Sequence, residues 1–106
     1  MKLPDCIFCN LDKSSILLEN EKAVVINDKY PQSKGHLLII SKDHFEKYFD
    51  LPADIRNSMW ELLEEAKSLS EKEHSPAGYN INVNVGRSSG QIIMHAHIHL
   101  IPRYGK

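Results

Sequence analysis

Residues 94–101 alternate histidine with apolar side chains, and this pattern constrains the fold more than any other feature of the chain. Single apolar residues separate His95, His97 and His99. Successive side chains of a β-strand point to opposite faces of its sheet, so a strand here presents a row of imidazoles on one face and apolar residues on the other. A rise of about 3.3 Å per residue places neighbouring histidines about 6.6 Å apart and the outer two about 13 Å apart. Two of them can share one metal ion, whereas all three hardly can.

The alternative is that each of these histidines is an ordinary structural residue. A buried imidazole costs free energy of desolvation unless it has a hydrogen-bonding or metal partner. Three imidazoles in register on one strand, backed by an apolar face, therefore favour a functional cluster.

The length and charge of the chain limit its class. With 106 residues it can bury one hydrophobic core, so we expect a single domain spanning residues 1–106. The formal net charge is −1 and no long basic block occurs, so binding to nucleic acid is not expected. The chain has no apolar signal segment at Met1–Asp5 and no apolar run approaching a membrane span. We expect a cytoplasmic protein in a reducing compartment, with no membrane partner.

Five strands and one helix are predicted from the apolar patterns. A stripe of apolar side chains at helical spacing predicts a helix that begins at Pro52 and ends near His74. The order strand, strand, strand, helix, strand, strand indicates an α+β domain, in which a five-stranded antiparallel sheet packs on one main helix. The strands are expected over residues 16–19, 22–28, 35–41 and 79–85, followed by the histidine strand.

The fourth predicted strand carries asparagines on one face and apolar side chains on the other. A short loop would join it to the histidine strand as a hairpin, which brings Asn84 beside the imidazoles. That loop, residues 86–91, is rich in Gly and Ser and offers backbone N–H groups to an anion. Beside the histidines it is a candidate phosphate cradle.

A neutral imidazole can attack phosphorus when a hydrogen bond to its other ring nitrogen fixes the tautomer. His97 is the candidate nucleophile because it has an imidazole on either side. His99 or His95 could then donate a proton to a departing oxygen or stabilise a negative charge.

Cys6 and Cys9 form a CxxC pair near the start of the chain. A redox CxxC normally opens a helix after a strand, and only five residues precede Cys6 here. Two thiolates on a tight turn need only two further ligands to complete a tetrahedral zinc site. The residues favour zinc, and an empty, reduced pair is the alternative.

The stretch from His95 to Ile101 resembles the motif of the histidine triad (HIT) family, in which three histidines alternate with apolar residues and two apolar residues follow. The resemblance extends over nearly the whole chain. It implies a five-stranded antiparallel sheet with helices, a homodimer, and a nucleotide hydrolase or transferase that forms a covalent nucleotidyl-histidine. The supporting segments are Cys6–Cys9, Asn27-Asp28 with Pro31, Gly35–Ile40 with His44, and Gly78–Gln91.

The same resemblance assigns roles residue by residue. His97 is the expected nucleophile, His99 contacts the phosphate and the leaving group, and His36 matches the family's fourth active-site histidine. His44 and His95 match the ligands that complete a structural zinc site with the cysteines, and catalysis itself is expected to need no cofactor. The expected substrate-binding residues are Phe8, Ile26 and Asn27 at the base, Asp28 at the ribose, and Asn84, Gly90 and Gln91 near the phosphate.

Position 92 departs from the family pattern, because Ile92 stands where relatives usually carry a Ser or Thr that touches the phosphate. The predicted function is hydrolysis or nucleotidyl transfer on purine nucleoside phosphoramidates or dinucleoside polyphosphates, with release of a nucleoside monophosphate. The alternative is a zinc-stabilised nucleotide-binding or interaction module with little catalytic activity. A metallohydrolase that uses the histidine row is a third, weaker hypothesis.

Overall fold

The fold is known from a computed structural model, which describes residues 2–105. One long helix packs on an antiparallel sheet of five strands in the order β1-β2-β3-β5-β4. The α+β fold predicted from the sequence is confirmed. The elements are β1 (Ile16–Glu19), β2 (Ala23–Asn27), β3 (Leu37–Ser41), α1 (Ala53–His74), β4 (Gly78–Asn82) and β5 (His97–Arg103).

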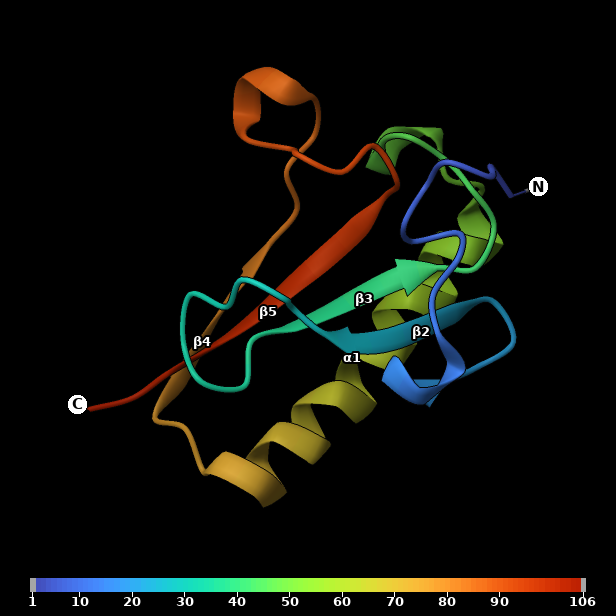
Figure 1. Ribbon diagram of the computed structural model, residues 1–106. Coiled ribbons are helices and arrows are strands. Elements are labelled where there is room, and N and C mark those ends of the chain that lie inside the picture. Colours follow the sequence, from blue (N-terminus) through green and yellow to red (C-terminus); the bar gives the residue numbers. More distant parts are fainter. Residues whose placement is uncertain (1, 106) are drawn as a thin grey trace.

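The two faces of the sheet bury different residues. On one face α1 covers the sheet, and its apolar stripe, which includes Met59 and Leu62, packs on Val25, Ile39 and Ile98. On the other face the N-terminal segment, drawn in blue in Figure 1, covers part of the sheet. Its Phe8 packs in a second, smaller cluster with Val24, Ile26, Leu38 and Ile40.

This arrangement follows the alternation of β5. Ala96, Ile98 and Leu100 belong to the core under α1, while His97 and His99 face the opposite side. The predicted separation of apolar and imidazole faces is therefore confirmed for this strand. The apolar face of β5 packs against the helix. This packing fixes the position of the imidazoles on the opposite face of the strand.

The turn between β2 and β3 depends on a glycine. Gly35 has a φ of +85°, and a Cβ atom there would lie 2.7 Å from Cδ2 of His74 at the end of α1. Glycine alone combines this left-handed backbone with so close an approach. The contact fixes the path of the chain as it enters His36 and β3.

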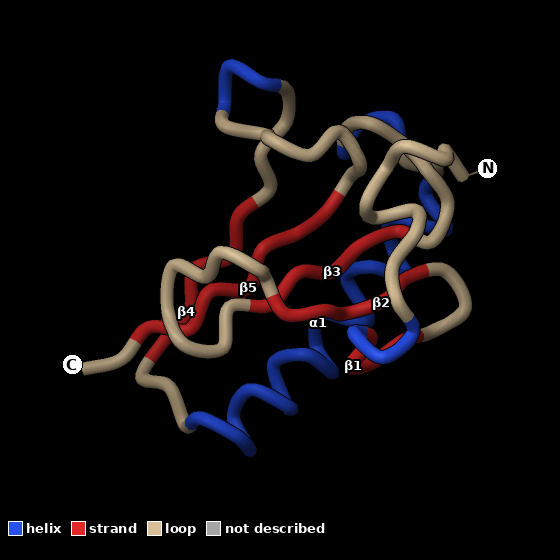
Figure 2. The backbone as a smooth tube through the Cα atoms, viewed as in Figure 1, coloured by secondary structure: helices blue, strands red, loops and turns tan. Residues whose placement is uncertain are grey.

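The connection between β4 and β5 differs from the short hairpin loop predicted above. The last paired residue of β4 is Asn82, opposite His99, and β5 begins only at His97. Residues 83–96 form a long loop that projects beyond the sheet, coloured orange in Figure 1 and tan in Figure 2, with a short 3₁₀ turn at its tip. His95 therefore precedes the strand, because the N–H of Ala96 donates to the carbonyl of Phe45 and not to a neighbouring strand.

Among residues 2–105, no helix has the length and apolar character needed to cross a membrane.

Candidate active site and metal centre

A cavity of about 480 Å³ opens on the face of the sheet opposite α1. Most of the residues predicted from the sequence to form the site line this cavity, although they come from four separate parts of the chain. They are Phe8, Ile26, Asn27, Asp28, Asn84, Gly90, His97 and His99. His36 and Gln91 are buried and do not line the cavity.

The backbone fixes the tautomer of His97. Its Nδ1 lies 2.7 Å from the carbonyl oxygen of His95, which can only accept a hydrogen bond, so Nδ1 carries the proton and donates. The lone pair is therefore on Nε2. Burial lowers the pKa of His97 below its ordinary value of 6.5, and the hydrogen bond to His95 and the charge of Asp28 oppose this only in part. The ring is neutral at pH 7, as a nucleophile must be.

A chain of hydrogen bonds fixes His99 in the same way. The N–H of Gln32 donates to Nδ1 of His36 at 3.0 Å, so the proton of His36 is on Nε2. His36 Nε2 lies 2.9 Å from His99 Nδ1 and donates to it, which leaves the proton of His99 on Nε2. His99 thus offers an N–H donor on the face that borders the cavity.

Asp28, directly after β2, places its carboxylate beside both His36 and His99. Its Oδ2 lies 3.3 Å from His36 Nε2 and 3.9 Å from His99 Nδ1. Burial lowers the pKa of His36, and burial together with the nearby His97 and His36 lowers the pKa of His99 to about 4. Both rings are therefore neutral at pH 7 despite the neighbouring carboxylate.

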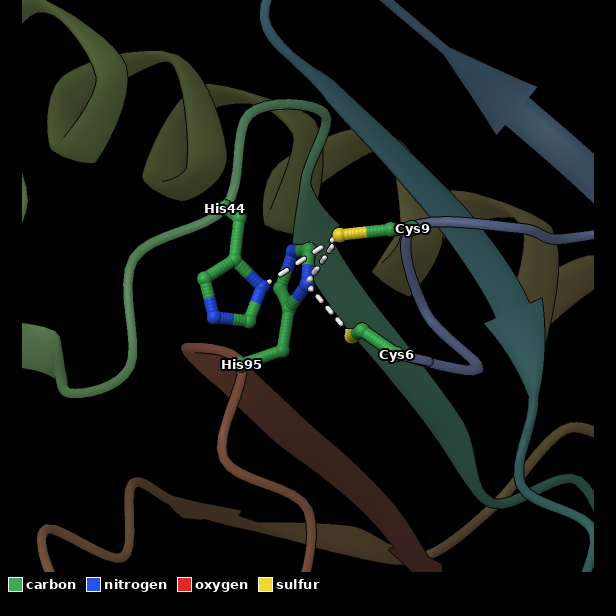
Figure 3. A group of neighbouring side chains, drawn as sticks. All are labelled: Cys6, Cys9, His44 and His95. Carbon is green, nitrogen blue, oxygen red and sulfur yellow. Dashed lines mark hydrogen bonds between the residues drawn. The ribbon is translucent and has the colours of Figure 1, made fainter. Parts of the chain in front are cut away.

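A second cluster lies next to the first. Figure 3 shows four side chains pointing toward one another: Cys6 and Cys9 from the N-terminal turn, His44 from the loop after β3, and His95 from just before β5. His95 Nδ1 lies 3.3 Å from Cys6 Sγ and 3.6 Å from Cys9 Sγ, and His44 Nδ1 lies 3.3 Å from Cys9 Sγ. The four ligand atoms all lie within 4.8 Å of one another.

The chemistry of this cluster fits zinc. Nε2 of His95 lies 2.7 Å from the carbonyl oxygen of Ser41 and donates to it, so the lone pair on Nδ1 points at the sulfurs. Two thiols and two imidazole nitrogens are a typical tetrahedral zinc set, and the second ring nitrogen is commonly held by a carbonyl as it is here. Burial raises the pKa of the Cys6 thiol above its ordinary value of 9.0, and a metal ion would offset this cost by binding the thiolate.

Asn10 holds the cysteine turn in place, and the sequence analysis did not identify it. Its Nδ2 donates to the carbonyls of Leu3, Pro4 and Cys6 at 2.9, 3.2 and 2.8 Å. The N–H of Cys9 also donates to the carbonyl of Cys6 at 3.1 Å. These bonds curl the segment so that both sulfurs face the same side. An Asn one position after a CxxC was the available signal.

Gln91 does not reach the cavity in this structure. Its Oε1 accepts from the N–H of Gly86, and its Nε2 donates to the carbonyls of Glu46 and Ile93. The side chain is buried and holds the loop of residues 83–96 closed. Gly90, with a φ of +101°, faces Asn84, whose Nδ2 would lie 3.6 Å from a Cβ at that position.

Comparison with known proteins gives a consistent result. Residues 11–106 match the family described as the HIT domain. A HIT family protein from Bacillus anthracis has a crystal structure that matches with a TM-score of 0.89 at 33% identity, covering 97% of this chain and 76% of that one. A Zn-bound histidine triad family protein from Mycobacterium smegmatis matches with a TM-score of 0.86 at 26% identity, covering 95% and 76%. The adenylylsulfatase HINT3 of Arabidopsis thaliana is 33% identical over 103 residues, 93% of this chain and 52% of that protein.

Proposed function

This chain belongs to the histidine triad (HIT) family, and on that premise we propose that it hydrolyses or transfers nucleotides through a covalent nucleotidyl-histidine at His97. The family generally comprises nucleotide hydrolases and transferases, and HINT3 is an adenylylsulfatase. The proposed substrates are purine nucleoside phosphoramidates or dinucleoside polyphosphates, and the product is a nucleoside monophosphate. The observation that carries the proposal is the hydrogen bond from His97 Nδ1 to the His95 carbonyl, which leaves the Nε2 lone pair free to attack.

In the first step, Nε2 of His97 forms a bond to the α-phosphorus while the bond from phosphorus to the leaving group breaks. His99 Nε2–H donates a hydrogen bond to the negatively charged phosphoryl oxygen, which stabilises the transition state. Because His99 is neutral, the leaving atom takes its proton from solvent water.

In the second step, a water molecule attacks the phosphorus and loses its proton to solvent. The phosphorus–nitrogen bond breaks and its electron pair returns to His97 Nε2, so the nucleoside monophosphate is released and the enzyme is regenerated. The carboxylate of Asp28 is proposed to accept hydrogen bonds from the ribose hydroxyls. Phe8, Ile26 and Asn27 border the base, while Asn84 and Gly90 border the phosphate.

The metal centre is proposed to hold zinc through Cys6, Cys9, His44 and His95. The bound ion would supply structural stability by tying the N-terminal turn to the sheet, and the residues that react lie outside it. The Zn-bound relative from Mycobacterium smegmatis supports this assignment.

A cytoplasmic homodimer is proposed as the working form. The support is that β4 is an edge strand of the sheet and that its Ile81 is half exposed. An unpaired edge with an apolar side chain is suited to pairing with a second copy of the chain. Light scattering on the purified protein measures the oligomeric state directly.

Trapping the covalent intermediate tests the proposed mechanism. The protein is mixed with adenosine 5′-phosphoramidate, quenched within milliseconds and digested, and the adduct is located by mass spectrometry. We expect an acid-labile, alkali-stable adenylyl group on His97, and a loss of kcat of several orders of magnitude in His97→Ala. Lys67→Ala is the control, because Lys67 is an exposed residue of α1 that does not line the cavity. An adduct on another residue, or turnover without any adduct, contradicts the assignment.

Ile92 favours the second candidate, a nucleotide-binding module with little catalytic activity, because it replaces a polar contact to phosphate with an apolar side chain. That candidate predicts AMP binding by calorimetry together with a rate that His97→Ala leaves unchanged.

A further inference from the structure

The end of the cavity assigned to the base is mostly apolar. Its walls include Phe8, Leu11, Ile26 and Leu38, and all of these except Leu11 are buried. Apolar contact is non-directional, so these side chains can hold any flat base and cannot distinguish one purine from another. Selection among purines must therefore come from polar groups at this end of the cavity.

Ser15 is a polar side chain at this end. It lines the cavity directly before β1, and the next residue, Ile16, pairs with Ile26 on β2. Ile16 also packs with Phe8 in the smaller core cluster. Ser15 therefore borders the apolar end of the cavity on the side of β1.

The hydroxyl of Ser15 is set to accept a hydrogen bond from a ligand. Its Oγ donates its proton to the carbonyl oxygen of Asp12 at 2.6 Å, and a carbonyl oxygen has no proton to give in return. The same 3₁₀ turn is held by two backbone donors, since the N–H of Ser15 donates to that carbonyl at 2.9 Å and the N–H of Ser14 donates to Asp12 Oδ1 at 3.1 Å. A hydroxyl turned to donate to a ligand would lose its bond to Asp12.

Asn27 is the second polar side chain at this end, and its hydrogen bonding is adaptable. Asn27 follows Ile26 as Ser15 precedes Ile16, so both lie at the same end of the antiparallel pair formed by β1 and β2. Among residues 2–105 the Asn27 amide has no hydrogen-bond partner, so it can turn and either donate or accept. Of these two side chains, only Ser15 has a fixed hydrogen-bond sense.

We propose that Ser15 is a specificity-determining residue that selects adenine over hypoxanthine and guanine. Its Oγ accepts a hydrogen bond from the 6-amino group of adenine, and the Asn27 amide bonds the neighbouring ring nitrogen. Hypoxanthine and guanine carry a 6-oxo group, which would place one acceptor against another and leave both unsatisfied beside apolar walls. This inference rests on the function proposed above and narrows its purine substrates to adenine nucleotides.

Four nucleoside 5′-phosphoramidates test the proposal through kcat/KM for release of the nucleoside monophosphate. Their nucleosides are adenosine, inosine, guanosine and purine riboside, which has only hydrogen at position 6. We expect adenosine to exceed inosine and guanosine by about 10- to 100-fold, since a hydrogen bond is replaced by two unpaired acceptors. Purine riboside should lie between them, because it neither donates to Ser15 nor opposes it.

Two serine variants of the same turn locate the effect. Ser15→Ala should lower the ratio of adenosine to inosine by about fivefold or more, and it should leave kcat/KM for purine riboside within about twofold of the parent value. A merely structural role of Ser15 would lower all four substrates alike. Ser14→Ala is the matched control, because Ser14 is exposed, does not line the cavity and joins the turn through its backbone N–H. It should keep the ratios of the parent chain.

The outcomes separate this inference from the proposed function. If adenosine phosphoramidate is turned over through an adduct on His97 but inosine equals it, or if Ser15→Ala leaves the ratio unchanged, the inference on Ser15 alone is wrong. Guanosine as the best substrate would place its 2-amino group at Ser15 and also overturn the assignment to adenine.

If no substrate is turned over and no adduct forms, the proposed function fails, and calorimetry still tests the choice of base. AMP should then bind about tenfold or more tightly than IMP to the parent chain, and this difference should shrink in Ser15→Ala. Equal affinities of the parent chain for AMP and IMP would overturn the inference as well.

Discussion

His95 and His97 are neighbours in the histidine row, but they use different ring nitrogens. His95 directs Nδ1 at the cysteines, and His97 directs Nε2 at the cavity. His95 donates from Nε2 to the Ser41 carbonyl, so its lone pair on Nδ1 faces the cysteine sulfurs. His97 donates from Nδ1 to the His95 carbonyl, so its lone pair on Nε2 faces the cavity. A single backbone hydrogen bond on each ring therefore distinguishes the proposed metal ligand, His95, from the proposed nucleophile, His97, two residues away.

His36 is proposed to act as a positioning residue through His99. His36→Phe removes the N–H that donates to Nδ1 of His99. The proton of His99 can then lie on either ring nitrogen, so a smaller fraction of the molecules offers the Nε2–H donor to the phosphate. We expect kcat to fall about 10- to 100-fold while KM changes less than threefold. Steady-state kinetics on adenosine 5′-phosphoramidate measures the two constants. His36→Gln keeps an N–H donor and should recover part of kcat; a rise in KM with kcat unchanged would assign His36 to substrate binding.

At the scale of elements, the N-terminal segment is attached to the sheet through its side chains and not through strand pairing. Residues 2–12 contain no strand or α-helix, and the segment is anchored by Phe8 in the smaller core cluster and by the cysteines at the metal centre. Ile7 and Phe8 also line the cavity. Zinc would therefore hold in place a wall of the substrate site as well as the chain terminus.

Loss of zinc is expected to destabilise the protein more than it weakens phosphate binding. We expect about one zinc ion per chain by elemental analysis of untagged protein, and we expect His44→Asn to lose it and to lower Tm by about 10 °C or more. Lys67→Ala is the control, because Lys67 is exposed on α1 and lies outside the cluster, and it should retain the metal. A metal-free parent chain with the same Tm as zinc-loaded protein would show that the cysteines do not serve a metal.

The sequence predicts the elements better than the loops that complete the site. The apolar stripe of α1 and the alternation in β5 are local patterns, and both are found in the structure. The start of β5 at His97 and the position of Gln91 depend on backbone partners in the loop after β3, at Phe45 and Glu46. Such pairings join segments more than forty residues apart in the sequence, and no periodicity encodes them.

At the scale of the whole molecule, the two faces of the sheet serve different purposes. The face under α1 buries apolar side chains that form the larger core, whereas the opposite face buries His36, His95 and His97 and leaves His99 partly buried. Burial keeps these imidazoles neutral at pH 7, which both proposed roles require. The same burial makes the folded state sensitive to acid, because a buried imidazole resists protonation and an unfolded one does not.

His99 should contribute measurably to the loss of stability in acid. Its pKa is about 4 in the folded protein and 6.5 when unperturbed, and it faces His36 from the turn before β3, His97 from β5 and Asp28 from the end of β2. Below pH 6.5 His99 becomes protonated in the unfolded chain, whereas in the folded chain it stays neutral down to about pH 4. The free energy of unfolding should therefore be highest above pH 6.5 and should fall by about 2 kcal/mol from this residue as the pH drops to 4.

Urea unfolding of the parent chain and of His99→Asn at pH 4 to 8 measures this contribution. The two proteins share the same cysteines and the same His44 and His95, so loss of metal in acid is common to both and cancels in the difference. We expect the variant to lose less stability than the parent between pH 6.5 and 4, since asparagine does not titrate. Parallel curves for the two proteins would mean that His99 is protonated in the folded state near its ordinary pKa, and a neutral N–H donor could not then be its role at pH 6.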